Sequence, residues 1–238
     1  MKKGIVLIML CFLLVLNIVS AWNWQTHQMF AEKAYNSMPL DLRDKLNLTA
    51  MKEGAIAPDK DFHDNIKHHY PPSYDLALKW LNFSCDDNCD YNKASYDFGV
   101  ASHYISDSFV APHYIAKEPS YLHSEFERQS YISKVKCYDY NLDLEEALKI
   151  GSENYKDWGE WLITKDKNII YNEIDEAMTA VYSAAFDKFK FECSTKETKV
   201  EYVKGYFTKG NILLGLGFLS AIIILLFLFK KKIIFASK

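Results

Sequence analysis

The histidines of this chain are unevenly distributed, and several of them stand beside carboxylates at helical spacing. All seven lie between residues 27 and 123. His103 and Asp107 are four positions apart, as are His123 and Glu127, so each pair lies on one face of a helix. Imidazole and carboxylate groups are the ligands that zinc accepts in a site without thiolates. The two pairs therefore indicate a metal site.

Further histidine and aspartate residues surround these two pairs. His113 follows Pro112, which turns the chain, and His27, Asp59 and His68 lie upstream. One such pair alone would more often be a hydrogen-bonded feature of the core or surface. Two ligands on adjacent turns of a rigid helix lose little entropy when they converge on one ion, and here two pairs occur with several additional ligands. The set as a whole favours a site for more than one metal ion.

The elements that must position these residues are expected to be helices. The chain shows no convincing strand alternation and few hairpin signals. Pro39 and Gly54 are expected to end or interrupt helices. Helices are predicted over residues 28–36, 41–46, 74–82, 93–108, 122–138, 142–163 and 170–189. The predicted fold class is all-α, a single multi-helix domain with the metal ions in a cleft.

Composition and charge exclude several classes of protein. The 238 residues are 49% hydrophobic and 25% charged, with nine Gly and six Pro, which excludes disordered and collagen-like chains. Residues 22–210 hold 22 Lys and Arg against 31 Asp and Glu, a net charge of −9. An acidic body is a poor electrostatic match to nucleic acid, so no stable nucleic-acid partner is expected.

The N-terminal segment is typical of a secretory signal peptide. Lys2 and Lys3 precede an apolar run at 4–18, and small residues follow at 19–21. Cleavage after residue 21 would leave Trp22 as the first residue of the mature chain. The alternative is an uncleaved N-terminal anchor.

The C-terminal segment is typical of a transmembrane helix. Residues 212–229 carry no charge, and three lysines follow at 230–232. A helix of this length matches the hydrocarbon thickness of a bilayer, and the cationic end is expected in the cytoplasm. A buried core helix and a glycolipid-anchor signal are weaker alternatives. The predicted organisation is a signal peptide at 1–21, an extracellular domain at 22–195, a linker at 196–210, a membrane span at 211–229 and a cytoplasmic tail at 230–238.

Cysteine usage agrees with an extracellular domain. Four cysteines remain after the signal peptide, and an even number in a secreted domain suggests two disulfides. We favour Cys85–Cys89 and Cys137–Cys193, the second tying two helices together, although sequence leaves all three pairings open. Half of a zinc finger at Cys85 and Cys89 is a weaker alternative.

Five segments together resemble the zinc-dependent phospholipase C family of bacteria, which shares a superfamily with fungal zinc-dependent single-strand nucleases. The similar segments are 22–27, 53–59, 68–72, 103–113 and 122–127. They span roughly half of the mature extracellular domain and are specific only in combination. Two intervals are shorter than is usual in the family, from Asp59 to His68 and from His113 to His123. The loops that shape the substrate pocket are therefore trimmed, and the resemblance implies no headgroup preference.

The resemblance implies three Zn²⁺ ions per chain. The ligands implied for the first ion are Asp59, His68, His103 and Asp107. Those for the second are the backbone of Trp22, His27 and Asp107, which bridges the two ions. Those for the third are His113, His123 and Glu127. In the family the mature Trp binds zinc through its free amine and its carbonyl, which favours cleavage before Trp22. His69 and His63 are alternatives to His68.

The resemblance also implies a reaction. A water shared by the bridged pair of ions would attack the phosphorus of a phosphodiester, with Asp59 as general base or only as a ligand. The expected activity is that of a membrane-anchored extracellular phospholipase C. A single-strand nuclease of the same superfamily is the alternative, because the five-residue step from Trp22 to His27 is closer to the nucleases, although those usually carry Asp where this chain has Glu127. A non-catalytic zinc-binding domain is a third possibility.

Overall fold

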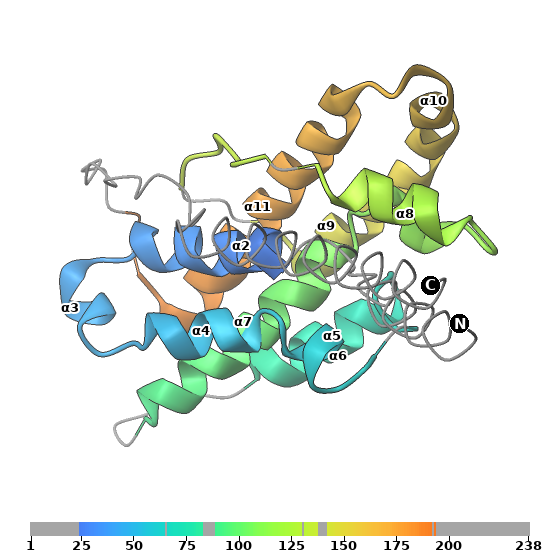
Figure 1. The fold of residues 1–238 in the computed structure, drawn as a ribbon. Coiled ribbons are helices and arrows are strands. Elements are labelled where there is room, and N and C mark those ends of the chain that lie inside the picture. Colours follow the sequence, from blue (N-terminus) through green and yellow to red (C-terminus); the bar gives the residue numbers. More distant parts are fainter. Residues whose placement is uncertain are drawn as a thin grey trace, which may run out of the picture. The chain divides into compact units, whose positions relative to one another are not determined.

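The computed structural model describes residues 24–64, 66–82, 89–129, 131–137, 142–191 and 193. All of them belong to one compact unit, and within them the regular structure is helical, with no strand (Figure 1). The elements are α2 Trp24–Ser37, α3 Leu40–Arg43, α4 Leu48–Gly54, α5 Ala57–Lys60, α6 Pro72–Leu81, α7 Tyr91–Asp107, η1 Ala111–Tyr114, α8 Ser120–Glu127, α9 Leu144–Gly151, η2 Ser152–Lys156, α10 Asp157–Thr164 and α11 Lys167–Phe189. The prediction of an all-α fold is confirmed for this part of the chain.

Both chain ends lie outside the described residues. The predicted signal peptide, Trp22, Cys85, the linker and the predicted membrane span at 211–229 all belong to those ends or to gaps. Among the helices that the structure describes, none combines the length and the apolar character needed to cross a bilayer.

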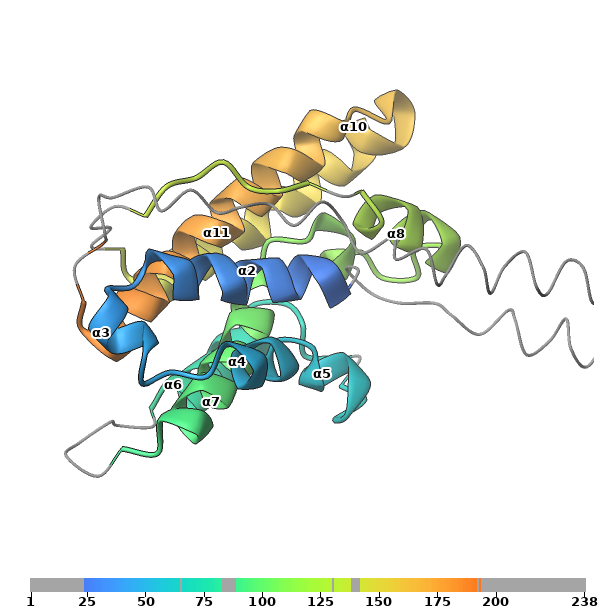
Figure 2. The ribbon, with the colours of Figure 1, turned by 60° about the vertical axis from the view of Figure 1, so that its left-hand side comes forward.

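Helix α7 is the central element of the fold. It begins where the Asp90 carboxylate accepts hydrogen bonds from the backbone N–H groups of Asn92 and Lys93, at 3.1 and 3.0 Å. It packs against α2, α4, α6 and α11 (Figure 2), and its residues from Asp97 to Asp107 are all buried. A helix surrounded in this way carries any polar residue of its last turns into the protein interior.

Two glycines allow α4 and α7 to approach each other closely. A Cβ atom on Gly99 of α7 would lie 2.0 Å from the Met51 carbonyl oxygen, and one on Gly54 of α4 would lie 2.1 Å from the Tyr96 carbonyl oxygen. Both obstacles are backbone atoms, which cannot rotate away. Glycine is therefore required on each side of this contact, which sets the depth at which the last turn of α7 lies.

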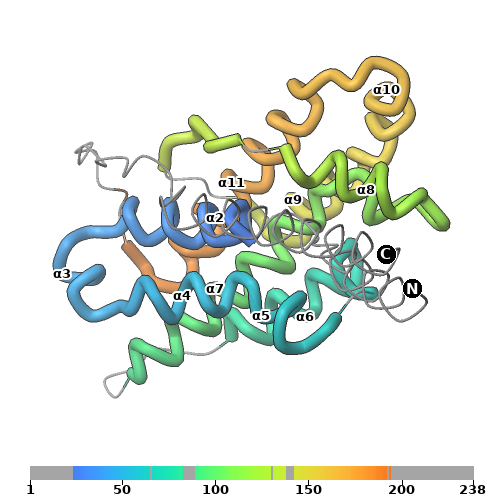
Figure 3. Tube along the Cα trace, in the orientation of Figure 1, coloured from blue at the N-terminus to red at the C-terminus, as the bar shows by residue number. Residues whose placement is uncertain are grey.

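The described residues after α8, 128–129 and 131–137, are not helical, so the predicted helix over 122–138 is wrong there. Burial alternates along residues 131–137, and the segment runs as an uncoiled tube (Figure 3). The Tyr131 hydroxyl and the Ser133 hydroxyl donate to the Asp175 carboxylate of α11, at 3.0 and 2.6 Å. These two contacts to one carboxylate favour an extended chain along α11 over continuation of α8.

The predicted helix over 142–163 is also divided. The chain forms α9, the 3₁₀ turn η2 and α10 in succession. Gly151 packs against the Phe109 ring, where a Cβ would lie 2.6 Å from a ring carbon, and the Asn154 side chain donates to the Phe109 carbonyl at 3.0 Å. The chain around η2 thus packs against Phe109, in the loop that follows α7. Helices α4 and α5 were not predicted, and the short α3 was predicted at 41–46.

The Cys137–Cys193 disulfide is confirmed, with 5.7 Å between the two Cα atoms. It does not join two helices as expected, because Cys137 lies in the extended segment and Cys193 lies beyond the end of α11. Cys89 is also disulfide-bonded, and its predicted partner Cys85 lies outside the described residues.

The close contact of α4 and α7 leads to a prediction about stability. Gly99→Ala is expected to lower the free energy of unfolding by about 2 kcal/mol or more, because two backbones must separate. Gly159→Ala is the matched control, since a Cβ there meets nothing within 4 Å, and it should be neutral or stabilising by up to about 1 kcal/mol. Chemical denaturation of both variants measures the difference. Equal stability of the two variants would contradict the role assigned to Gly99.

Candidate metal centre

Eight of the nine predicted ligands lie in the described part of the chain, and the structure brings all eight into one region. They come from six segments, since α2, α5, the loop before α6, α7, η1 and α8 each contribute. In chain order these residues are His27, Asp59, His68, His103, Asp107, His113, His123 and Glu127. The ninth, Trp22, lies outside the described residues.

The carboxylate of Asp107 lies at the centre of the first cluster. Its Oδ2 atom is 2.6 Å from His68 Nδ1 and 3.2 Å from His103 Nε2, and its Oδ1 atom is 3.5 Å from His27 Nε2. Asp107 and the rings of His27 and His103 are fully buried. Three imidazoles from three segments therefore surround one carboxylate at the end of α7.

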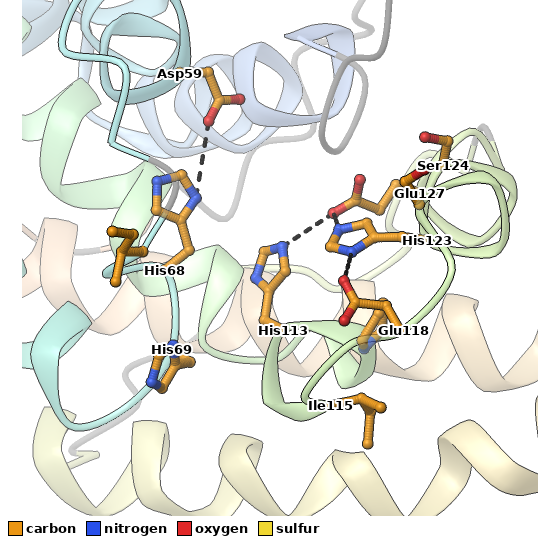
Figure 4. Close-up of a pocket in the computed structure, with 12 residues that line it drawn as sticks. Asp59, His68, His69, His113, Ile115, Glu118, His123, Ser124 and Glu127 are labelled. Atoms are coloured by element: carbon orange, nitrogen blue, oxygen red, sulfur yellow. Dashed lines mark hydrogen bonds and ion pairs between the residues drawn. The ribbon is translucent and has the colours of Figure 1, made fainter.

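Asp59 adds a second carboxylate to this cluster. Its Oδ1 atom is 3.5 Å from His103 Nε2 and 3.8 Å from His68 Nδ1, and Figure 4 shows it facing the His68 ring. It belongs to α5, a single turn that opens with Ala57 and Pro58. The Asp59 side chain is 12% exposed, so it lies between the buried cluster and the pocket described below.

The second cluster consists of His113, His123 and Glu127. The Nε2 atoms of the two imidazoles lie 3.1 and 2.8 Å from the same carboxylate atom, Glu127 Oε1. Glu127 is 1% exposed. His123 and Glu127 share one face of α8, as their spacing predicted, while His113 reaches them from η1 (Figure 4).

Several buried polar atoms in the two clusters make no hydrogen bond of acceptable geometry. They are Asp59 Oδ2, both carboxylate oxygens of Asp107, Nε2 of His68 and of His103, and Glu127 Oε2. Leaving a buried polar atom unsatisfied costs about 1–3 kcal/mol. A divalent cation would satisfy these atoms, because carboxylate oxygens and imidazole nitrogens are zinc ligands. The residues present therefore fit a metal ion.

Three sets of three residues can be formed in which the ligand atoms of the set all lie within 4.8 Å of one another. They are His27, Asp59 and His103; His68, Asp107 and His113; and His113, His123 and Glu127. The last set matches the ligands predicted for the third ion. The first two sets differ from the prediction, because Asp59 and His103 are grouped with His27, and His68 and Asp107 with His113. The 3.5 Å between His27 Nε2 and Asp107 Oδ1 also accommodates the predicted division.

Neutral acceptors orient the rings of His103 and His113. His103 Nδ1 is 2.9 Å from the Ala55 carbonyl oxygen, and His113 Nδ1 is 3.1 Å from the Asp107 carbonyl oxygen. Each contact leaves the opposite nitrogen, Nε2, directed at a carboxylate of the cluster. Partners of this kind fix the tautomer and orientation of metal-binding histidines.

Burial and charge act against each other on the ionisable groups. Burial disfavours the charged form of His103, but Asp107 and Asp59 outweigh it and raise its pKa to about 10. Burial likewise opposes ionisation of Asp107, but the neighbouring imidazoles hold its pKa well below the usual range. A cation entering this cluster would replace bound protons, so metal binding is expected to tighten as the pH rises.

The second cluster lines a pocket of about 450 Å³. Ile66 and Ile115 give it apolar walls, while Glu118, Ser120 and Ser124 add polar groups. None of these five residues was predicted. Ile66, Ile115 and Glu118 lie outside the helices and give no periodic signal, and serine is not among the usual zinc ligands. His69 also lines this pocket, whereas His63 lines a different one around Phe62 and Trp80. Of the three candidates, His68 is the histidine that faces Asp107.

The fold and the two clusters define a helical protein with a candidate site for divalent metal ions. Over residues 26–189 the sequence matches the family described as zinc dependent phospholipase C. The match covers more than half of the chain, which therefore belongs to this family. Membership supports zinc as the metal and a hydrolase role in general. Comparisons with curated proteins and with solved structures gave no match.

A further buried carboxyl group lies behind the site. Glu173 of α11 is 1% exposed and accepts a hydrogen bond from the Ala111 N–H of η1 at 3.3 Å. Burial raises its pKa well above the usual value, and the carboxylates of Asp157 and Glu176 act in the same direction. Glu173 therefore keeps its proton in the folded protein over a range of pH in which the unfolded chain releases it.

This difference predicts a pH-dependent effect of Glu173→Gln. Above a pH of about 4.5, the ordinary pKa of the group, unfolding of the wild type releases a proton, so its stability falls as the pH rises. Glutamine has no proton to release. The variant should gain stability over the wild type from pH 5 to pH 8, measured as the midpoint of thermal unfolding. The exposed Glu160→Gln on α10 serves as control, and a pH-independent difference for Glu173→Gln would refute the explanation.

Proposed function

We propose that this protein is a zinc-dependent phosphodiester hydrolase that releases phosphorylated headgroups from phospholipids, as a phospholipase C does. The observation that carries the proposal is the proximity of two imidazole–carboxylate clusters, one around Asp107 and one around Glu127, joined through His113. Their unsatisfied buried atoms match the ligand chemistry of zinc. The family membership gives the reaction class.

In this proposal the nine predicted residues hold three zinc ions, with Asp107 shared by two of them. Bound zinc would lower the pKa of water and stabilise negative charge on the phosphoryl oxygens. The chain's own groups place the substrate and move the proton. Burial raises the pKa of Asp59, but the nearby imidazoles of His103 and His27 outweigh it and lower that pKa. Asp59 is therefore an ionised carboxylate that can accept a proton at the edge of the pocket.

The chemistry of the pocket favours a phospholipid over a nucleic acid. Among the described residues that line it, none is Phe, Tyr or Trp, so it offers no stacking platform of the kind on which single-strand binders hold bases. Ile66, at the pocket mouth, is 78% exposed. An exposed aliphatic side chain next to the site suits contact with the apolar part of a lipid.

The proposed setting is the outer face of a cell membrane. A cleaved signal peptide would expose the amine of Trp22 as a zinc ligand, and the apolar segment at 211–229 would anchor the chain. The three C-terminal lysines after it would remain in the cytoplasm. Such an anchor would hold the pocket near lipid headgroups at high effective concentration.

A substrate comparison tests the proposed activity. The zinc-loaded protein is incubated separately with mixed micelles of phosphatidylcholine, phosphatidylethanolamine or phosphatidylinositol, and with single-stranded DNA. Phosphorylated headgroup should be released from at least one lipid, while the DNA stays intact. Cleavage of only the DNA would establish the nuclease alternative. Cleavage of neither substrate by a protein that binds zinc would favour the non-catalytic alternative.

The shared position of Asp107 predicts the effect of Asp107→Asn. Loss of this carboxylate should remove two of three zinc ions, because both depend on it, and the ion at His113, His123 and Glu127 should remain. Hydrolysis should fall at least about 100-fold. Metal content by mass spectrometry and headgroup release measure the two effects.

The matched control is Asp97→Asn. Asp97 is buried on the same helix, and its carboxylate pairs with Lys93 rather than with a histidine of either cluster. This control variant should keep the wild-type zinc content. A variant Asp107→Asn with full zinc content and full activity would show that Asp107 does not bridge metal ions.

A further inference from the structure

The imidazole of His123 is held by a carboxylate at each of its two nitrogens. Its Nε2 atom lies 2.8 Å from Glu127 Oε1, and its Nδ1 atom lies 2.7 Å from Glu118 Oε1 (Figure 4). Glu127 is a predicted metal ligand, whereas Glu118 belongs to no motif or helical pair in the sequence. The two contacts place His123 between one carboxylate inside the cluster and another outside it.

Glu118 differs in charge from the groups that hold Nδ1 of His103 and of His113. Nδ1 of His103 faces the Ala55 carbonyl oxygen and Nδ1 of His113 faces the Asp107 carbonyl oxygen, both neutral acceptors. A carboxylate accepts a stronger hydrogen bond from Nδ1–H than a carbonyl does. It also makes the opposite nitrogen, Nε2, more basic, so that its electron pair binds a metal ion more strongly.

The backbone around Glu118 favours this contact. Lys117 adopts a left-handed conformation with φ of 64°, which turns the chain between η1 and α8. Pro119 then occupies the position before the first residue of α8. Glu118 lies between these two constrained residues, so its side chain can return to His123 one turn into the following helix.

We propose that Glu118 is a positioning residue of the metal site, which fixes the tautomer and orientation of His123 and strengthens its bond to zinc. The inference rests on the proposed function, since it concerns the same metal ions. The side chain of Glu118 is 19% exposed and is not part of the hydrophobic core. Its removal should therefore affect zinc binding far more than folding.

Two substitutions separate the hydrogen bond from the charge. Glu118→Ala removes both, and Glu118→Gln keeps an oxygen that can accept from Nδ1–H. Zinc affinity of the full-length protein in detergent is measured by competition with a chromophoric chelator. Glu118→Ala should weaken one zinc ion by about 10–100-fold and leave the others unchanged. Glu118→Gln should weaken the same ion by a smaller factor.

The control is Glu125→Ala on α8, whose carboxylate pairs with Lys165 at 3.1 Å and contacts no histidine among the described residues. It should bind zinc as the wild type does. Thermal unfolding in excess chelator gives a second readout. The metal-free Glu118→Ala protein should unfold at the wild-type temperature, because the proposed role is exerted through the metal ion.

The possible outcomes distinguish this inference from the proposed function. Wild-type zinc affinity in Glu118→Ala would overturn the role of Glu118 while leaving the metal site in place. Loss of stability in chelator, with equal weakening of all ions, would show a merely structural role and would also overturn it. A wild-type protein that binds no zinc would overturn the proposed function, and the inference with it.

Discussion

The structure depends on the burial of the Asp107 carboxylate among three imidazoles. A charge removed from water is costly unless it is paired, and here the pairing comes from His27, His68 and His103. These histidines belong to separate segments, so the cluster can form only when α2, the loop before α6 and α7 are in place together. The close approach of α4 and α7 at Gly54 and Gly99 sets the depth of the helix that carries Asp107. Fold and site therefore constrain each other.

Asp107 also joins the two clusters. Its side chain faces the three imidazoles, while its backbone carbonyl accepts from His113 Nδ1 at 3.1 Å. His113 in turn directs its other nitrogen at Glu127. A shift of the last turn of α7 would thus be transmitted to the second cluster through a single ring. This coupling favours a site in which the metal ions would occupy fixed positions relative to one another, as the proposed reaction at a phosphate requires.

The eight residues that the structure brings together could be selected from the sequence because they follow a helical period or stand in motifs. His103 and Asp107 share one face of α7, and His123 and Glu127 share one face of α8, because each pair is four residues apart. The sequence does not point to Glu118 or Glu173, since a contact from a loop, or from a helix distant in the sequence, leaves no periodic signal. The helix predicted over 122–138 was wrong beyond Glu127 because Asp175 binds Tyr131 and Ser133 and favours an extended chain. Which ligands share an ion depends on distances in space, which spacing does not determine.

The charge of the site relative to its surroundings bears on the substrate. The chain from 22 to 210 has a net charge of −9, whereas three divalent ions would exceed the four carboxylates of Asp59, Asp107, Glu118 and Glu127 by two positive charges. The attraction for phosphate would then be confined to the pocket. A nucleic acid presents a phosphate at every nucleotide and would be repelled along much of the surrounding surface. A phospholipid presents one phosphate, next to an apolar body that Ile66 and Ile115 can contact, so a locally cationic pocket in an acidic domain suits a lipid better than a polyanion.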